Sequence, residues 1–164
     1  MLGLTTAAEY EAMIQSLQWA DLRSLWEKIK QRNTPEWDSG RAFEYLVIRA
    51  FQLDGAQVRY SYSVSFGEGE EVEQIDGAVH YSGLSCLVES KDFAEKKVNI
   101  EPIAKLRNQL LRRPASTLGL VFSSTGFTNP AIMLSRFLSP QTILLWNGQE
   151  IQYALEQESI CELF

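Results

Sequence analysis

The chain has 164 residues, of which 45% are hydrophobic and 22% are charged, and its formal net charge is −6. These values fit one globular domain with a sizeable core, and the acidic balance taken alone argues against a dedicated nucleic-acid binder. No apolar run approaches the roughly 18 residues that a membrane helix needs, and the first six residues do not resemble a signal peptide. We therefore expect a cytoplasmic protein without a membrane partner.

Two cysteines and one histidine, with no cysteine pair at ligand spacing, predict reduced thiols and argue strongly against a structural zinc site.

The first part of the chain is expected to be helical. Residues 7–32 predict one or two helices, because apolar residues recur at roughly helical spacing. These residues are Leu17, Leu22, Leu25, Trp26 and Ile29. The segment 31–36 breaks the pattern and predicts a loop. We expect residues 1–36 to form a helical extension that packs on a nuclease-like domain of residues 37–164, as one compact domain overall, or on a second subunit.

A clearer helix is expected next, from Ser39 as its N-cap to about Asp54-Gly55. Its apolar face consists of Phe43, Leu46, Val47, Ala50 and Phe51. Glu44 lies inside this apolar arc at 100° per residue, so its carboxylate needs a partner or a function. The alternative is a carboxylate in the first helical turn, where it interacts favourably with the helix dipole and reaches water.

The rest of the chain alternates strands and helices. Strands are expected at residues 58–66, 74–81, 84–91, 117–123 and 142–146, with an acidic, glycine-containing loop at 67–71. Helices are expected at 100–113, from Pro130 onwards, and at 148–158. This order predicts an α/β fold in which helices flank a mixed β-sheet.

The hairpin around Ser82-Gly83 brings two carboxylates together. If its strands pair symmetrically about this turn, Tyr81 faces Leu84 and Asp76 lies opposite Glu89. The two Cβ atoms would then be about 5 Å apart. Because like charges directly opposite each other are destabilising, a hard divalent cation bound by their oxygens is expected to offset them.

A lysine completes this constellation. Lys91 follows Glu89 by two residues and therefore projects from the same face of the sheet. The arrangement suits metal-dependent phosphodiester hydrolysis, with Asp76 and Glu89 as ligands, together with the Ser90 carbonyl, and Lys91 positioning the water and stabilising charge. Glu44 could hold a second metal or its water. The alternative is a surface ion pair of little energetic value.

A basic band accompanies the predicted site. Residues 91–113 carry seven basic and three acidic residues, a net charge of +4, so the remainder carries −10. Such a band on an acidic body can hold a phosphate backbone. In the helix expected at 100–113, Lys105, Gln109 and Arg112 lie on one polar face and could contact DNA phosphates. A plain solvated face is the alternative.

Four short motifs resemble a known family. They are Gly40-Arg41-Ala42-Phe43-Glu44, Ile75-Asp76-Gly77, Leu87-Val88-Glu89-Ser90-Lys91, and the run from Gly119 to Thr128. In order and spacing they are similar to the restriction-endonuclease-like PD-(D/E)XK superfamily, and most of all to its Mrr-like catalytic domains, over about residues 38–137. The resemblance implies a restriction-endonuclease-like fold, a DNA substrate and Mg²⁺, or Mn²⁺ in its place. It also implies Asp76, Glu89 and Lys91 as the catalytic set, with Glu44 assisting.

Three functional hypotheses remain open. The first is a metal-dependent DNA endonuclease of restriction, defence or repair type. The second is a non-catalytic module that keeps the nuclease fold and acts in assembly, although clustered buried charge would bring such a module nothing. The third is a Holliday-junction-type resolvase, which needs a dimer with two sites. Because residues 1–36 do not predict a DNA-reading domain, a homodimer or a separate DNA-recognition subunit is the expected partner besides DNA.

Overall fold

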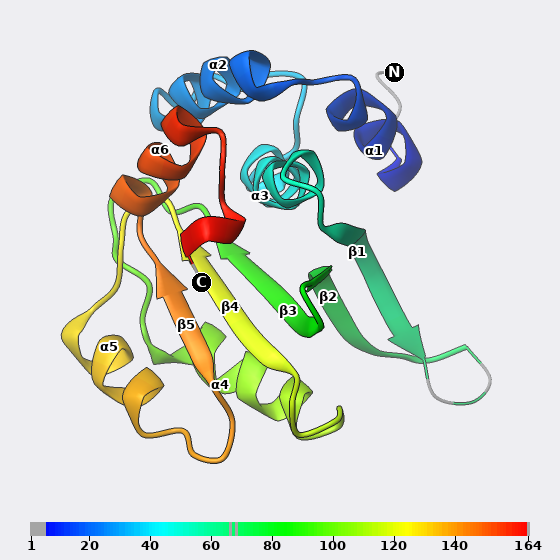
Figure 1. The fold of residues 1–164 in the computed structure, drawn as a ribbon, viewed down its shortest axis with the longest axis vertical. Coiled ribbons are helices and arrows are strands. Elements are labelled where there is room, and N and C mark those ends of the chain that lie inside the picture. The colour runs from blue at the N-terminus through cyan, green and yellow to red at the C-terminus, as the bar shows by residue number, and fades with distance from the viewer. Residues whose placement is uncertain (1–5, 66, 68, 164) are drawn as a thin grey trace.

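A computed structural model describes residues 6–65, 67 and 69–163 of the chain (Figure 1). Its helices are α1 (Ala7–Gln15), α2 (Trp19–Lys30), α3 (Arg41–Leu53), α4 (Ile100–Leu110), α5 (Asn129–Arg136), α6 (Gly148–Gln157) and the 3₁₀ helix η1 (Cys161–Leu163). Its strands are β1 (Gln57–Ser65), β2 (Glu71–Tyr81), β3 (Leu84–Lys91), β4 (Leu118–Ser123) and β5 (Ile143–Trp146). None of the described helices is long and apolar enough to cross a membrane.

The strands form one mixed sheet in the order β1-β2-β3-β4-β5. The pairs β1–β2 and β2–β3 are antiparallel, whereas β3–β4 and β4–β5 are parallel. The parallel pairs need crossover connections, which α4 and α5 supply. This confirms the predicted α/β fold with a mixed sheet and flanking helices.

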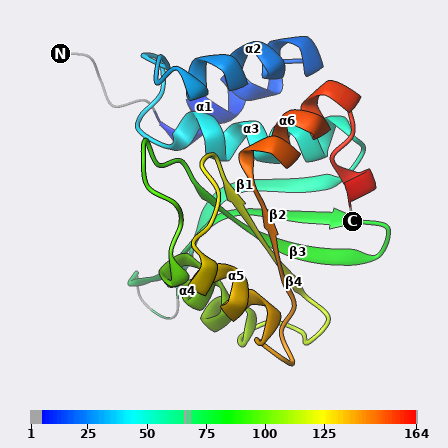
Figure 2. The same cartoon turned by 90° about the vertical axis from the view of Figure 1, so that its left-hand side faces the viewer.

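Helices cover both faces of the sheet, so the molecule has three layers (Figure 2). On one face α1, α2, α3 and α6 enclose a core that includes Val88 and Leu120. On the other face α4 and α5 cover a second core that includes Leu87 and Val121. Neighbouring strand residues thus enter different cores, as the period of two requires. On β3, Glu89 and Lys91 follow Leu87 at this period, so they belong to the α4 side.

The hairpin between β2 and β3 has the predicted register. Tyr81 pairs with Leu84, and the ladder continues to Gly77 opposite Val88. Ser82 and Gly83 form the turn, and both have positive φ angles, as a type I′ turn requires. Asp76 and Glu89 are therefore the next residues beyond the last pair of this ladder.

Predicted boundaries differ from the observed ones by one to three residues, as at the start of α3, the start of β2 and the end of α4. Gly40, with a left-handed backbone, is the N-cap of α3 in place of Ser39. The strand expected to begin at 74 begins at Glu71, because its first residues pair with the end of β1, and this shortens the expected loop at 67–71. The helix expected to reach Arg113 ends at Leu110. Phe66, the predicted last residue of β1, lies outside the described residues.

The N-terminal helices share the core of the first face. Trp26 of α2 packs against Phe43 of α3 with ring centroids 5.8 Å apart. The buried Arg49 of α3 donates from Nε to the carbonyl oxygen of Leu17, which lies between α1 and α2, at 3.0 Å. After α2, Arg32 donates to Asp92, so the loop following α2 is tied to the segment that follows β3.

Candidate active site

Two adjacent strands bring the predicted acidic and basic side chains together. Lys91 Nζ lies 2.5 Å from Glu89 Oε1 and 4.0 Å from Asp76 Oδ2. The backbone N–H of Ser90 donates to Asp76 Oδ2 at 2.9 Å and fixes the position of that carboxylate. All three side chains are buried or half-buried. The arrangement is therefore an enclosed ion cluster rather than the exposed surface pair that was the alternative.

Glu89 has a second cationic partner. Its carboxylate is fully buried, and Lys105 Nζ lies 2.8 Å from Oε2 and 3.1 Å from Oε1. The sequence pointed to Lys105 only as a phosphate contact. The crossover between the parallel strands β3 and β4 lays α4 over the face that carries Glu89, but the rotation of α4 about its axis is set by packing.

Glu44 has a cationic partner, as expected for a carboxylate that lies within the apolar face of a helix. The carboxylate is buried, and Arg41 Nη1 lies 2.8 Å from its Oε1 and 3.0 Å from its Oε2. The spacing of three residues along a helix is a signal that the sequence already contains. Burial raises the pKa of Glu44 to about 7, and the negative charge of Asp76 adds to that rise. Glu44 is thus electrostatically linked to the cluster on the neighbouring strands.

The cluster perturbs its own protonation equilibria. Burial raises the pKa of Asp76, and the charge of Glu89 raises it further, against the opposing effect of Lys91. For Lys91, burial lowers the pKa, but the charges of Glu89 and Asp76 outweigh burial, so the net pKa is raised. A raised pKa keeps the Lys91 ammonium protonated, which suits charge stabilisation and not proton abstraction.

The donor set for a metal is small. Among the described residues, no group of three or more His, Cys, Asp or Glu side chains is placed to hold a metal ion. Glu44 therefore does not complete a three-carboxylate set with Asp76 and Glu89. The Asp76–Glu89 pair still fits Mg²⁺ or Mn²⁺, because Mg²⁺ is commonly held by one or two carboxylates while water and substrate phosphates complete its shell.

A cavity of about 320 Å³ opens beside this cluster. Its lining includes Glu89, Lys91, Phe93, Lys96, Lys97 and Lys105. Four lysines thus line this cavity together with the carboxylate of Glu89. Lys96 lies over the ring of Phe93 at 4.6 Å from its centroid, which holds this aromatic ring at the rim.

The predicted polar face of the helix after β3 does not form. Gln109 is buried, and its Nε2 donates to the carbonyl oxygen of Gln74 at 3.1 Å. Arg112 lies beyond the end of α4 and is bound to Glu73. Of the three residues proposed to contact phosphates, only Lys105 lines the cavity beside the carboxylates. Lys96 and Lys97 are the cations that this prediction lacked, although they belong to the basic band at 91–113.

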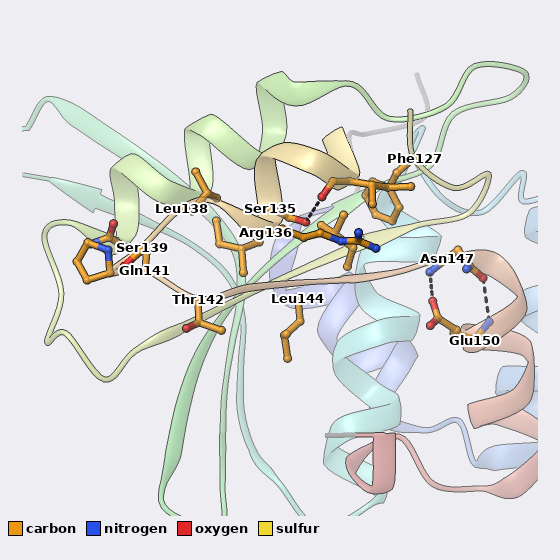
Figure 3. A pocket seen from close by; sticks show the side chains of 14 residues that line it. Phe127, Ser135, Arg136, Leu138, Ser139, Gln141, Thr142, Leu144, Asn147 and Glu150 are labelled. Atoms are coloured by element: carbon orange, nitrogen blue, oxygen red, sulfur yellow. Dashed lines mark hydrogen bonds between the residues drawn. The ribbon is translucent and has the colours of Figure 1, made fainter. Parts of the chain in front are cut away.

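A second cavity lies away from the carboxylates. It has a volume of about 610 Å³ and lies between α5 and the edge strand β5 (Figure 3). Arg136 and Leu138 line it on the α5 side, and Leu144 and Asn147 line it on the β5 side. None of the predicted site residues belongs to its lining, so it does not contribute to the chemistry proposed for the cluster.

Comparisons with known proteins agree with this architecture. A sequence model of a family described as restriction endonuclease, Mrr_cat, matches residues 37–155. The crystal structure of AF1548, described as a protein of unknown function, is similar with a TM-score of 0.57 and 17% identity, over 70% of this chain and 65% of that one. The DNA modification-dependent restriction endonuclease AspBHI is similar with a TM-score of 0.51 and 14% identity, over 97% of this chain and 40% of that one. The chain thus spans less than two thirds of either structure, and no curated protein matches it.

Proposed function

Because the chain belongs to the Mrr-like, PD-(D/E)XK-type restriction endonuclease family, we propose that it is a metal-dependent DNA endonuclease of restriction, defence or repair type. The observation that carries the proposal is the cluster in which two buried carboxylates, Asp76 and Glu89, share the ammonium of Lys91. Family membership alone implies a nuclease of restriction type. The cluster adds the chemistry that such a nuclease needs.

Each residue of the cluster has a distinct proposed role. A divalent cation held by Asp76 and Glu89 would polarise a phosphoryl oxygen and make water a better nucleophile. Lys91 stays protonated and stabilises the negative charge that develops on the phosphoryl oxygens while water oxygen bonds to phosphorus and the leaving ester oxygen departs. The N–H of Ser90 orients Asp76, and Arg41 holds Glu44 beside it.

DNA is the proposed partner, and its backbone is proposed to follow the basic rim of the cavity. Lys96, Lys97 and Lys105 line that cavity together with Glu89, and cations of this kind bind phosphates without regard to base sequence. Phosphate contacts carry no information about base sequence, so sequence recognition is proposed to involve a second copy of the chain or a separate DNA-recognition subunit.

The test is cleavage of supercoiled plasmid in Mg²⁺ or Mn²⁺ by wild type, Asp76→Asn and Lys91→Gln. Methylated plasmid belongs in the assay because AspBHI is described as DNA modification-dependent. Both variants should lose activity by about 100-fold or more, as expected when one charge-stabilising group is removed from an active site. Lys28→Gln, which changes an exposed lysine on α2, should cut like wild type.

Each alternative has its own outcome in this assay. Cleavage in chelator, or an Asp76→Asn variant that cuts at the wild-type rate, would contradict the proposal. If folded wild type cuts neither plasmid, the non-catalytic assembly module becomes the better account. A four-way DNA junction, added as a third substrate, distinguishes a resolvase by preferential cleavage of the junction over the plasmids.

A further inference from the structure

The carboxylate of Glu89 is bound by two ammonium groups. Lys91 Nζ lies 2.5 Å from its Oε1, and Lys105 Nζ lies 2.8 Å from its Oε2. Both oxygens of this carboxylate are therefore engaged by cations of the protein itself. Asp76 differs, because its Oδ2 accepts from the backbone N–H of Ser90 at 2.9 Å and lies farther from Lys91 Nζ, at 4.0 Å.

The cluster as a whole is balanced in charge when its groups are ionised. Its three carboxylates are Glu44, Asp76 and Glu89, and its three cations are Arg41, Lys91 and Lys105. A divalent cation added to this set leaves an excess of two positive charges. Such an excess is costly in a buried site unless a cation leaves or anions arrive.

Lys105 is the cation best placed to leave. Its side chain is 43% exposed, whereas that of Lys91 is 27% exposed and lies between the two carboxylates. Lys105 also lines the cavity beside Lys96 and Lys97, so its ammonium can turn from Glu89 towards the solvent side of the same cavity. A phosphate lying in this cavity would offer that ammonium a new anionic partner.

We propose that Lys105 is the counter-ion of Glu89 in the metal-free protein, and that a divalent cation displaces it from Glu89 onto a backbone phosphate of the substrate. Metal and DNA then bind cooperatively, because each favours the position of Lys105 that the other requires, and this coupling is reciprocal. The inference rests on the proposed function, since it concerns the metal and the phosphate backbone of the same site.

Calorimetric titration with Mg²⁺ alone tests the first half of the proposal. Lys105→Met removes the competing charge, so its affinity for Mg²⁺ should exceed that of wild type by about tenfold, within the usual range of coupling between sites. Lys105→Arg keeps the charge and should bind as wild type does. Lys28→Met makes the same change at an exposed lysine of α2 that does not line the cavity, and it should also bind as wild type does.

DNA binding tests the second half. The affinity of each protein for a labelled DNA duplex is measured by fluorescence anisotropy with and without Ca²⁺. The factor by which Ca²⁺ strengthens DNA binding should be about tenfold larger for wild type than for Lys105→Met. Thermal unfolding of each variant establishes that it is folded. Equal or weaker Mg²⁺ binding by Lys105→Met, absence of binding in both proteins, or equal enhancement by Ca²⁺ would each overturn the proposal.

Asp76→Asn separates this inference from the proposed function. If Mg²⁺ binds to wild type, depends on Asp76 and supports plasmid cleavage, the proposed function stands whatever Lys105→Met does. If wild type neither binds Mg²⁺ nor cuts, while Lys105→Met binds Mg²⁺ through Asp76, the counter-ion role stands and the proposed function fails.

Discussion

Gly77 follows the candidate ligand Asp76 in β2 and leaves no room for a side chain. A Cβ atom added there would lie 2.2 Å from Ile48 Cδ1 and 2.8 Å from Ile48 Cγ1. Ile48 is fully buried in the core of the first face and has little space to move away. We predict that Gly77→Ala lowers the free energy of unfolding by about 1–3 kcal/mol, the usual cost of overpacking a core, which urea unfolding measures.

Repeating the Gly77→Ala substitution in a second variant of the protein identifies the cause of this loss of stability. Ile48→Val removes the atom nearest to the added methyl group, so Gly77→Ala should cost less in the Ile48→Val protein than in wild type. An equal cost in the two backgrounds would show that the clash with Ile48 is not responsible. Plasmid cleavage by Gly77→Ala should also fall, because the strand has to shift next to Asp76.

At the residue scale, what the sequence could predict depends on periodicity. The proximity of Asp76 and Glu89 followed from one turn and a period of two, and the register of the hairpin is confirmed. The ion pair between Lys105 and Glu89 could not be predicted, because it depends on how α4 is rotated against the sheet. The catalytic roles of these residues stay predictions.

At the scale of elements, ion pairs of Glu73 link β2 to the residues that follow α4. The side chain is buried; Arg113 Nη2 lies 2.6 Å from its Oε2, and Arg112 binds its Oε1. The hydrogen bond from Arg113 holds the pKa of Glu73 below its ordinary value of 4.5. A carboxyl group with a lowered pKa stabilises the fold at pH values above its unfolded pKa, and this contribution is lost as pH falls through the folded pKa.

We predict that Glu73→Gln lowers the free energy of unfolding by about 2 kcal/mol at neutral pH, the order expected for hydrogen bonds to a charged group. The difference from wild type should shrink as pH falls below 4.5 towards the lowered pKa, because wild-type Glu73 then becomes neutral as well. Urea unfolding across this range measures both effects. Glu36→Gln, at an exposed position, should match wild type throughout, and a constant difference for Glu73→Gln would contradict the electrostatic origin.

The predicted elements were correct in type and order, and the errors lie where tertiary contacts decide. Residues Glu71 to Glu73 lack the apolar alternation of a strand, but they pair with the end of β1. Arg112 and Arg113 extend the helical pattern in sequence, yet their side chains are bound to Glu73 outside α4. Local propensity contains neither constraint, so the predicted start of β2 and the predicted end of α4 are each three residues from the observed ones.

At the scale of the whole molecule, charge is unevenly distributed. The net charge is −6, although residues 91–113 carry +4. Four lysines of that band line the cavity beside the carboxylates: Lys91, Lys96, Lys97 and Lys105. An acidic body repels DNA elsewhere, so association is proposed to be directed to this cavity and to weaken steeply with salt.

The N-terminal helices complete the core on the opposite face of the sheet. Trp26 is almost fully buried, and its Nε1 donates to Gln152 Oε1 of α6 at 2.6 Å. Without these helices, the apolar surfaces of α3 and α6 would face water, and the buried Arg49 would lose the carbonyl of Leu17. Both losses destabilise the fold, the first through exposed apolar area and the second through an unsatisfied buried donor.

We therefore predict that residues 37–164 alone do not fold cooperatively, although the family model begins at residue 37. Near-UV circular dichroism should show loss of fixed aromatic packing, and urea unfolding should lose its sigmoidal transition. A separate peptide of residues 1–36, added in excess, should restore both signals, because it supplies the apolar side chains of α1 and α2 that the first core lacks. If 37–164 unfolds cooperatively by itself, the extension is a dispensable attachment and the core of the nuclease domain is sufficient without Trp26.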